Sequence, residues 1–230
     1  MIIEIWSDFV CPFCYIGKRK VEKAINKLPN KPNIKVIYKA FELNPEAPLN
    51  NSLRGSKAFA KMKGYSEAQS KQMFLDVTKK ASEFGLKYDM ENTIPVKTYK
   101  AHRLAKWARI YKKENALTEL LMDAHFVKGL NIADDDVLLD FIKQLALNID
   151  EAKEVLQTNK YHEIVDNEIN EAYSLGVQGV PFFVFNRKFA VSGAAPDTHF
   201  ELALQKAMDG ETFETVNDFE SLCGPDGCAI

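Results

Sequence analysis

Short apolar runs rich in β-branched and aromatic residues stand near both ends of the chain and predict β-strands. Residues 2–6 and 34–41 are the first two such runs. The segment between them repeats apolar residues at the spacing of one helix face, at Val21, Ala24, Ile25 and Leu28. Strand, helix and strand in this order predict a βαβ unit, in which the two strands are parallel.

The middle of the chain has a different pattern. From residue 52 to residue 175, apolar residues recur almost entirely at helical spacing. Residues 66–69 (Ser-Glu-Ala-Gln) form a capping box that predicts a helix start. Three consecutive aspartates at 134–136 suit the positive end of a helix dipole and predict another start. This region is therefore expected to be a set of helices.

Strand patterns return at residues 181–185 and 188–191, with Asn186-Arg187 predicting a tight hairpin turn although it lacks a glycine. Pro196-Asp197 then opens a last amphipathic helix. We predict an α/β protein: a thioredoxin fold with an all-α helical domain inserted between its β-α-β and β-β-α halves. The expected boundaries are 1–48 for the first half, 49–160 for the insertion, 161–210 for the second half and 211–230 for a tail.

The charge and the apolar content of the chain exclude several classes of function. The formal net charge of −2 gives no electrostatic reason to expect a nucleic-acid partner or an anionic membrane surface. No apolar run approaches the roughly 18 residues that a membrane-spanning helix needs. The first residues lack the basic start and the long apolar stretch of a secretory signal. We therefore expect a cytoplasmic protein with no membrane partner.

The four cysteines fall into two close pairs, Cys11/Cys14 and Cys223/Cys228. A framework of structural disulfides would scatter them, so the pairing indicates redox cycling or metal binding. The motif Cys11-Pro12-Phe13-Cys14 lies between the first predicted strand and its helix. The first thiol is therefore expected at an exposed helix N-terminus, where backbone N–H groups and the helix dipole favour its anion.

Position assigns the roles within this motif. Cys11 is the predicted attacking thiol, and Cys14, one turn further in and more buried, is the predicted resolving thiol. Pro12 suits the first helical turn because its missing N–H costs nothing there. Phe13 supplies no charge, so the Cys11 anion would depend on backbone donors. The basic residues 18–20 are interpreted as a solvated helix face.

A zinc site is the main alternative for the two pairs, because CxxC is also a common zinc-ligand spacing. It would need Cys223 and Cys228 as the other ligands. None of the four histidines is spaced for a metal with another, and each is expected to be a surface or capping residue. We assign no metal ligand.

The tail pair flanks Gly224-Pro225-Asp226-Gly227, a strong turn sequence that would bring Cys223 and Cys228 within disulfide range. A disulfide that closes so short a loop adds little stability by chain entropy. We therefore expect this pair to assist the first as a secondary redox pair, with a passive disulfide, free thiols or zinc binding as the alternatives.

The sequence resembles the DsbA family of thioredoxin-fold oxidoreductases, and most of all its FrnE-like branch. The resemblance is carried by the helical middle of the chain and by residues 8–14, 179–184 and 191–194. The resemblance covers residues 1–210. It implies that Pro181 is a cis-proline beside the active-site cysteines and that Val180 offers its backbone to the substrate. Pro12 and Phe13 would also contact the substrate.

Two departures from the family pattern stand out. Phe13 replaces the histidine of the periplasmic oxidants, which puts a strongly oxidising potential in doubt. Ile5 stands where many thioredoxin-fold enzymes keep a buried carboxylate, so the proton acceptor for Cys14 is unassigned. Glu4 and Asp8 are the nearby candidates.

The sequence thus predicts a thiol–disulfide oxidoreductase acting on protein or small-molecule disulfides. No organic cofactor is expected, and thioredoxin or glutathione is the candidate electron partner. The direction of electron flow stays open. The inserted helices are expected to roof the site and select substrates. The enzyme alternative is a glutathione-dependent isomerase or transferase of the kappa or hydroxychromene-carboxylate isomerase type, against which the cysteine at position 11 counts because those enzymes use serine there.

Overall fold

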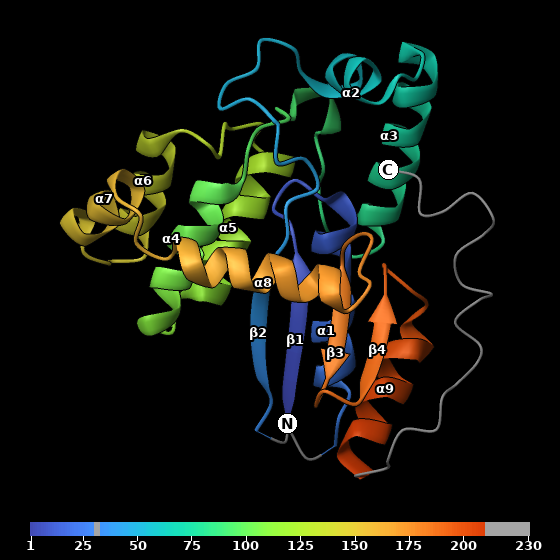
Figure 1. Ribbon diagram of the computed structural model, residues 1–230. Coiled ribbons are helices and arrows are strands. Elements are labelled where there is room, and N and C mark those ends of the chain that lie inside the picture. Colours follow the sequence, from blue (N-terminus) through green and yellow to red (C-terminus); the bar gives the residue numbers. More distant parts are fainter. Residues whose placement is uncertain (30–32, 210–230) are drawn as a thin grey trace.

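The computed structural model describes residues 1–29 and 33–209, and its strands form one four-stranded sheet (Figure 1). The strands are β1 (Ile2–Ser7), β2 (Lys35–Ala40), β3 (Phe182–Phe185) and β4 (Phe189–Ser192). Their order is β2-β1-β3-β4, with β1 and β2 parallel and the other two pairs antiparallel. This topology confirms the predicted thioredoxin fold.

Helices cover both faces of the sheet. Ile3 and Ile5 of β1 pack with Val21 of α1 (Pro12–Asn26) and with Phe200 of α9 (Asp197–Asp209). Alternate residues of a strand point to opposite faces, and the Trp6 indole accordingly donates to the Glu168 carbonyl on α8 (His162–Ser174), at 2.8 Å. Figure 1 shows α8 crossing the face of the sheet opposite to α1.

Between β2 and β3 the chain is almost wholly helical, as predicted. The remaining elements are α2 (Gly55–Lys63), α3 (Glu67–Ser82), the 3₁₀ turn η1 (Met90–Asn92), α4 (Tyr99–Ile110), α5 (Glu114–Phe126), α6 (Asp135–Gln144) and α7 (Ile149–Gln157). Ser66 forms the full capping box with Gln69, and Asp134 caps α6, so both predicted helix starts are confirmed.

Buried ion pairs tie this insertion to the sheet. Lys106 of α4 lies 2.8 Å from Glu168 of α8 and donates to the Tyr38 carbonyl of β2 at 2.7 Å. Glu168 in turn accepts the Ala40 backbone N–H at 2.7 Å. The carboxylates of Glu114 and Glu168 offset part of the desolvation cost of Lys106, although burial still lowers the pKa of this lysine. The cluster fixes α4 and α8 against the edge of β2.

The hairpin between β3 and β4 forms at the predicted residues without a glycine. Asn186 and Arg187 adopt φ values of 49° and 57°, the left-handed conformation that a two-residue type I′ turn requires. The Lys188 N–H closes the turn by donating to the Phe185 carbonyl at 2.9 Å. The Asn186 side chain also accepts the Ile2 backbone N–H at 2.8 Å, which joins the turn to β1.

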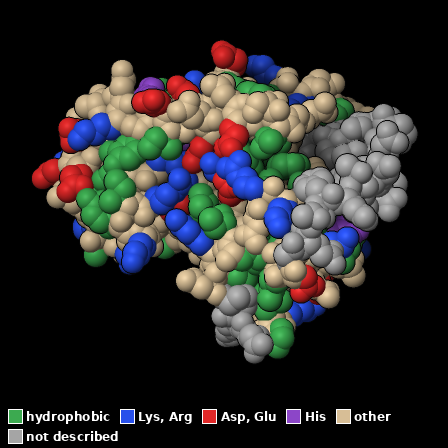
Figure 2. Space-filling model, turned by 60° about the horizontal axis from the view of Figure 1, so that its bottom comes forward, with side chains coloured by type: hydrophobic (Ala, Val, Ile, Leu, Met, Phe, Trp, Pro, Cys, Tyr) green, Lys and Arg blue, Asp and Glu red, His purple; other side chains and the backbone are tan. Residues whose placement is uncertain are grey.

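On the face shown in Figure 2, basic and acidic side chains are interspersed rather than grouped by sign. Surface ion pairs include Lys39–Glu171, 3.0 Å apart, and Arg187–Glu171, 2.6 Å apart. None of the helices in the described part of the chain combines the length and the apolar character that crossing a bilayer requires.

Candidate active site

The Cys11-Pro12-Phe13-Cys14 motif forms the junction between β1 and α1. Cys11 is the N-cap of α1 with an extended backbone, and Pro12 occupies the first helical turn as predicted. The Cys14 N–H donates to the Cys11 carbonyl at 3.1 Å, which places the cysteines on the same first turn. Both are free thiols in this structure.

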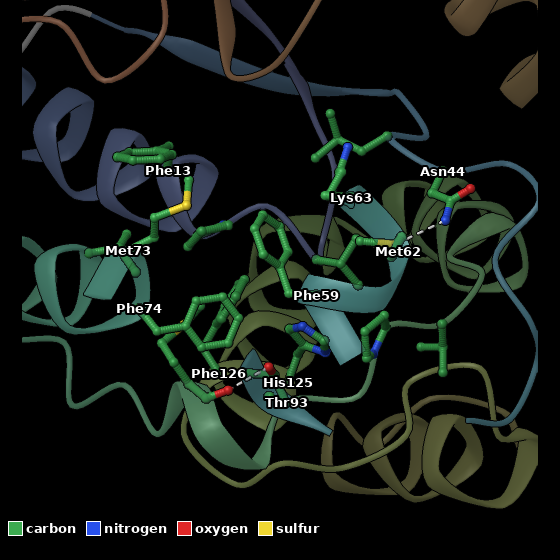
Figure 3. A pocket seen from close by; sticks show the side chains of 18 of the residues that line it. Phe13, Asn44, Phe59, Met62, Lys63, Met73, Phe74, Thr93, His125 and Phe126 are labelled. Carbon is green, nitrogen blue, oxygen red and sulfur yellow. Dashed lines mark hydrogen bonds between the residues drawn. The ribbon is translucent and has the colours of Figure 1, made fainter. Parts of the chain in front are cut away.

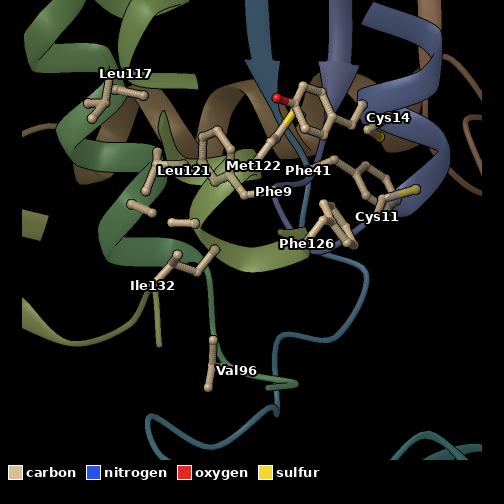
Figure 4. Packing of buried hydrophobic residues seen from close by; sticks show 14 of the residues in the cluster. Phe9, Cys11, Cys14, Phe41, Val96, Leu117, Leu121, Met122, Phe126 and Ile132 are labelled. Atoms are coloured by element: carbon tan, nitrogen blue, oxygen red, sulfur yellow. The ribbon is translucent and has the colours of Figure 1, made fainter. Parts of the chain in front are cut away.

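The predicted exposure of Cys11 is wrong: its side chain is 0% exposed. The helical insertion covers the start of α1, where the Tyr88 hydroxyl donates to the Pro12 carbonyl at 2.7 Å. Figure 4 shows Cys11 and Cys14 at the margin of an apolar cluster that includes Phe9, Phe41 and Phe126. The sequence pattern of α1 alone could not predict this burial, because the residues that cover Cys11 belong to the insertion, about seventy positions further along the chain.

Pro181 and Val180 lie beside this turn. The Val180–Pro181 peptide bond is cis, and the Cys11 thiol donates to the Val180 carbonyl at 3.3 Å. The Pro181 carbonyl accepts the Gly193 N–H at 2.8 Å, which fixes the segment before β3 to the end of β4. The fold therefore brings together the two motifs that are separated by about 170 residues in the sequence.

Gly17 makes this approach possible, and the sequence analysis did not single it out. A Cβ atom at this position would lie 2.8 Å from Cζ of Phe183 and 3.1 Å from Cγ of Pro181. Any side chain would therefore force α1 away from the Pro181 segment. A glycine inside an amphipathic helix pattern, one turn after the motif, is the signal that could have revealed it.

Cys14 is buried at the inner side of the turn. Burial raises the pKa of its thiol, and the hydrogen bond and the charge of neighbouring Cys11 raise it further. The Ser7 hydroxyl and the Asp8 backbone amide act in the opposite direction and lower this pKa. The buried Ser7 oxygen has no hydrogen-bond partner of ordinary geometry among the described residues, which leaves it available to a Cys14 thiolate.

Neither candidate carboxylate for Cys14 bonds to its thiol. Glu4 forms ion pairs with Lys39 at 3.4 Å and with Arg187. Asp8 accepts the Leu43 N–H at 2.8 Å, and its other oxygen lies 3.6 Å from Nε2 of His102. Asp8 therefore approaches Cys14 through its backbone amide, not through its carboxylate.

The basic residues 18–20 do not form the solvated face that the sequence suggested. Lys18 and Lys20 are buried, and each forms an ion pair with an acidic residue of another helix. Lys18 lies 2.9 Å from Glu119 of α5, and Lys20 lies 3.1 Å from Asp197 of α9. Hydrogen bonds from Arg19, Tyr15 and Lys18 lower the pKa of Glu119 to about 2. These pairs fasten α1 to its neighbours.

A pocket of about 350 Å³ opens beside the dithiol turn (Figure 3). Pro12 and Phe13 form part of its wall, and the rest comes from α2, α3, η1, the end of α5 and loop residues that include Val10 and Leu43. The Lys80 ammonium of α3 lies 5.5 Å from the centre of the Phe13 ring, a cation–π distance. The insertion thus covers the active-site turn, as expected: Lys80 lies over Phe13, and Tyr88 contacts Pro12.

The structure also changes the interpretation of two histidines. His102 and His125 are buried rather than at the surface, and His125 lines the pocket. Burial lowers the pKa of His125 to about 4, so its imidazole is neutral at pH 7. Among the described residues no group of three or more histidine, cysteine or acidic side chains is placed to hold a metal ion. Cys223 and Cys228 lie outside the described residues, so their predicted redox role stays a prediction.

Comparisons with known proteins agree with this geometry. Residues 2–205 match the family described as the DSBA-like thioredoxin domain. The chain is 32% identical to the probable DsbA oxidoreductase SCO1869 from Streptomyces coelicolor, with a TM-score of 0.86 over 100% of this chain and 99% of that one.

Two more distant structures share the fold. A 2-hydroxychromene-2-carboxylate isomerase is 16% identical, with a TM-score of 0.66 over 91% of this chain and 95% of that chain. The cytosolic disulfide reductase DsbM from Pseudomonas aeruginosa is 15% identical, with a TM-score of 0.62 over 92% of this chain and 100% of that chain. The match across nearly the whole length and the strand order lead to one conclusion: the chain belongs to the DsbA-like thioredoxin domain family.

Proposed function

We propose that this protein is a thiol–disulfide oxidoreductase in which Cys11 exchanges disulfides with the substrate and Cys14 resolves the mixed disulfide. The observation that carries the proposal is the position of the Cys11 thiol. It caps the start of α1, one turn from Cys14, and lies 3.3 Å from the Val180 carbonyl beside the cis-proline. Family membership supports the same chemistry.

In the reducing direction, the Cys11 thiolate attacks one sulfur of a substrate disulfide and the other substrate sulfur leaves as a thiolate. The Cys14 thiolate then attacks Sγ of Cys11, the substrate's remaining sulfur leaves, and the Cys11–Cys14 disulfide forms. Two electrons pass from the dithiol to the substrate. The oxidising direction is the reverse of these steps.

The environment of Cys14 sets the order of the two attacks. The charge of Cys11 raises the pKa of Cys14, so the two thiols do not ionise together. Once Cys11 is bound in a mixed disulfide, this repulsion is removed, while the Ser7 hydroxyl and the Asp8 amide still favour the Cys14 anion. Cys14 therefore ionises more readily in the mixed disulfide than in the free dithiol, while burial continues to raise its pKa.

Location and partners form part of the proposal. We place the protein in the cytoplasm, with glutathione or thioredoxin as the electron partner. The fold similarity to the cytosolic reductase DsbM, which also has a structure with GSH, is compatible with this choice. Cysteine at both position 11 and position 14 favours dithiol chemistry over isomerase chemistry.

The test is a trapping experiment with Cys14→Ser and Cys11→Ser variants in which Cys223 and Cys228 are also replaced by serine. Reaction with a disulfide substrate should leave Cys14→Ser as a stable mixed disulfide at Cys11, detected by mass spectrometry, whereas the parent protein should release both substrate thiols. Cys11→Ser should be inactive. Full turnover by Cys14→Ser, or a mixed disulfide at Cys14 in the parent, would contradict the assignment. The same parent, compared with the intact chain, shows whether the tail pair changes the reduction potential.

A further inference from the structure

The pocket beside the dithiol turn has a lining that the redox chemistry does not require. Its walls carry four phenylalanine rings, from Phe13, Phe59, Phe74 and Phe126, and three methionines, Met62, Met73 and Met90. Aromatic rings offer edge and face contacts to another ring, and methionine adapts its shape to a bound group. A volume of about 350 Å³ lies in the range of small-molecule sites.

From this lining we propose that the pocket binds the aromatic group of a low-molecular-weight disulfide and so selects aromatic disulfides as substrates of Cys11. The inference rests on the proposed oxidoreductase function and specifies its substrate class. Pro12 and Phe13 directly follow Cys11 and form the pocket wall. A ring bound there packs against Pro12 and Phe13 of the first turn of α1, so the attached sulfur can reach the neighbouring Cys11 thiol once the residues that bury this thiol move aside.

Among the described residues that line the pocket, His125 is the buried polar side chain that has an unpartnered atom. Its imidazole lies at the pocket wall near Phe126 and Thr93 (Figure 3), and its Nδ1 atom is buried without a hydrogen-bond partner among the described residues. A buried polar atom left unpaired is costly, and a ligand that bonds to it recovers that cost. Because a neutral imidazole has one donor and one acceptor nitrogen, a ring with a single polar atom suits it.

The geometry favours a small molecule over an extended polypeptide. Polypeptide substrates commonly bind by adding a strand to free backbone groups. Here the Val180 carbonyl already accepts the Cys11 thiol, and Val180 is buried. The pocket, in contrast, opens to solvent beside Met62, which is 40% exposed, and its rim carries Lys63 and Lys80.

The reaction conserves atoms and electrons without a further reagent. The residues over Cys11 move aside, its thiolate attacks one sulfur of the diaryl disulfide, and one aryl thiolate leaves. The Cys14 thiolate then attacks Sγ of Cys11 and the second aryl thiolate leaves. Two aryl thiols are formed, and the dithiol of the protein is oxidised to the Cys11–Cys14 disulfide.

The test compares two disulfides in single turnovers of the reduced full-length protein. The probes are 4,4′-dithiodipyridine, which has an aromatic ring with one polar atom, and bis(2-hydroxyethyl) disulfide, which has no ring. Met73→Trp fills the pocket from its half-buried position on α3. Leu75→Trp is the matched control, because Leu75 lies on the same helix, outside the pocket, and is 57% exposed.

We expect Met73→Trp to slow the reaction with 4,4′-dithiodipyridine about tenfold, the effect of losing a well-buried ring contact. Its rate with bis(2-hydroxyethyl) disulfide and both rates of Leu75→Trp should stay at the wild-type values. Met62→Trp, at the mouth on α2, should repeat the selective loss if Met73→Trp fails to fold. His125→Phe should also slow the aromatic probe selectively.

Equal slowing of both probes in Met73→Trp and Met62→Trp, or no slowing of either, would overturn the pocket assignment and leave the dithiol mechanism standing. So would slowing of an oxidised cysteine peptide without slowing of the aromatic probe, since that result would assign the pocket to a polypeptide side chain. Failure of the wild-type protein to reduce either probe would instead count against the proposed function itself.

Discussion

The Cys11 thiol and the Val180 carbonyl form a buried hydrogen bond of 3.3 Å between the two motifs of the site. This bond depends on the proton of the thiol. A thiolate has no proton to donate, so ionisation of Cys11 leaves the Val180 carbonyl without its partner. A buried carbonyl without a partner costs about 1–3 kcal/mol.

The contribution of this bond to stability can be measured with two replacements of the same residue. Cys11→Ser retains a donor for the Val180 carbonyl, whereas Cys11→Ala removes it. We expect Cys11→Ala to be less stable than Cys11→Ser by about 1 kcal/mol, the usual net value of one hydrogen bond. Urea unfolding of both variants under reducing conditions measures the difference. An equal or greater stability of Cys11→Ala would show that the bond does not contribute.

Ser7 is predicted to act on the second step of the reaction. Its hydroxyl lowers the pKa of Cys14, so Ser7→Ala should raise that pKa and slow release of the second substrate thiol. A hydrogen bond to an anion is worth about 1.5–3 kcal/mol, which allows a slowing of about tenfold near neutral pH. Stopped-flow absorbance of the two released thiols separates the steps.

Two features distinguish this positioning role from a general loss of structure. The first step, attack by Cys11, should keep its rate in Ser7→Ala, and the pH midpoint of the second step should move upward. Ser7→Thr retains the hydroxyl and should restore the wild-type rate. If both steps slow together, or if Ser7→Thr resembles Ser7→Ala, Ser7 does not act through Cys14.

Gly17→Ala tests how closely α1 must approach the Pro181 segment. The added Cβ would lie 2.8 Å from Cζ of Phe183, inside contact distance, so the helix or the ring must shift. We expect a loss of about 1–3 kcal/mol in the free energy of unfolding, typical of overpacking. Gly179→Ala is the control, because a Cβ there meets no atom within 4 Å. Equal stabilities of the two variants would contradict the close-packing argument.

The fold and the reactive pair could be predicted from the sequence because both depend on local patterns. The period-two strands and the CxxC motif lie in short segments, and the order of elements gave the topology. The Asn186-Arg187 turn formed where predicted, since its flanking strands impose the left-handed conformation.

Features that depend on distant contacts could not be predicted in this way. The burial of Cys11 comes from the covering insertion, and the burial of Lys18 from Glu119 on another helix. From the sequence of its own helix, each position is expected at the surface, because a lysine or a residue at a helix N-terminus is normally exposed to solvent. His125 likewise becomes a pocket residue only because residues of α2 and α3, far from it in the sequence, line the same pocket.

His125 gives a prediction for the pH dependence of stability. Burial lowers its pKa from the ordinary 6.5 to about 4 in the folded protein. As the pH falls below 6.5, the unfolded chain takes up a proton that the folded protein refuses until about pH 4. The stabilisation is therefore complete above pH 6.5 and is lost as the pH falls towards 4. At about 1.4 kcal/mol per pKa unit, the loss amounts to about 3 kcal/mol.

The measurement is the free energy of unfolding by urea at several pH values between 7 and 4, for the wild type and for His125→Gln. Glutamine does not titrate in this range, whereas every other ionisable group is common to both proteins and cancels in the difference. On acidification from pH 7 to pH 4 the variant should therefore lose about 3 kcal/mol less stability than the wild type. Parallel curves would mean that His125 accepts its proton as readily in the folded protein as in the unfolded chain.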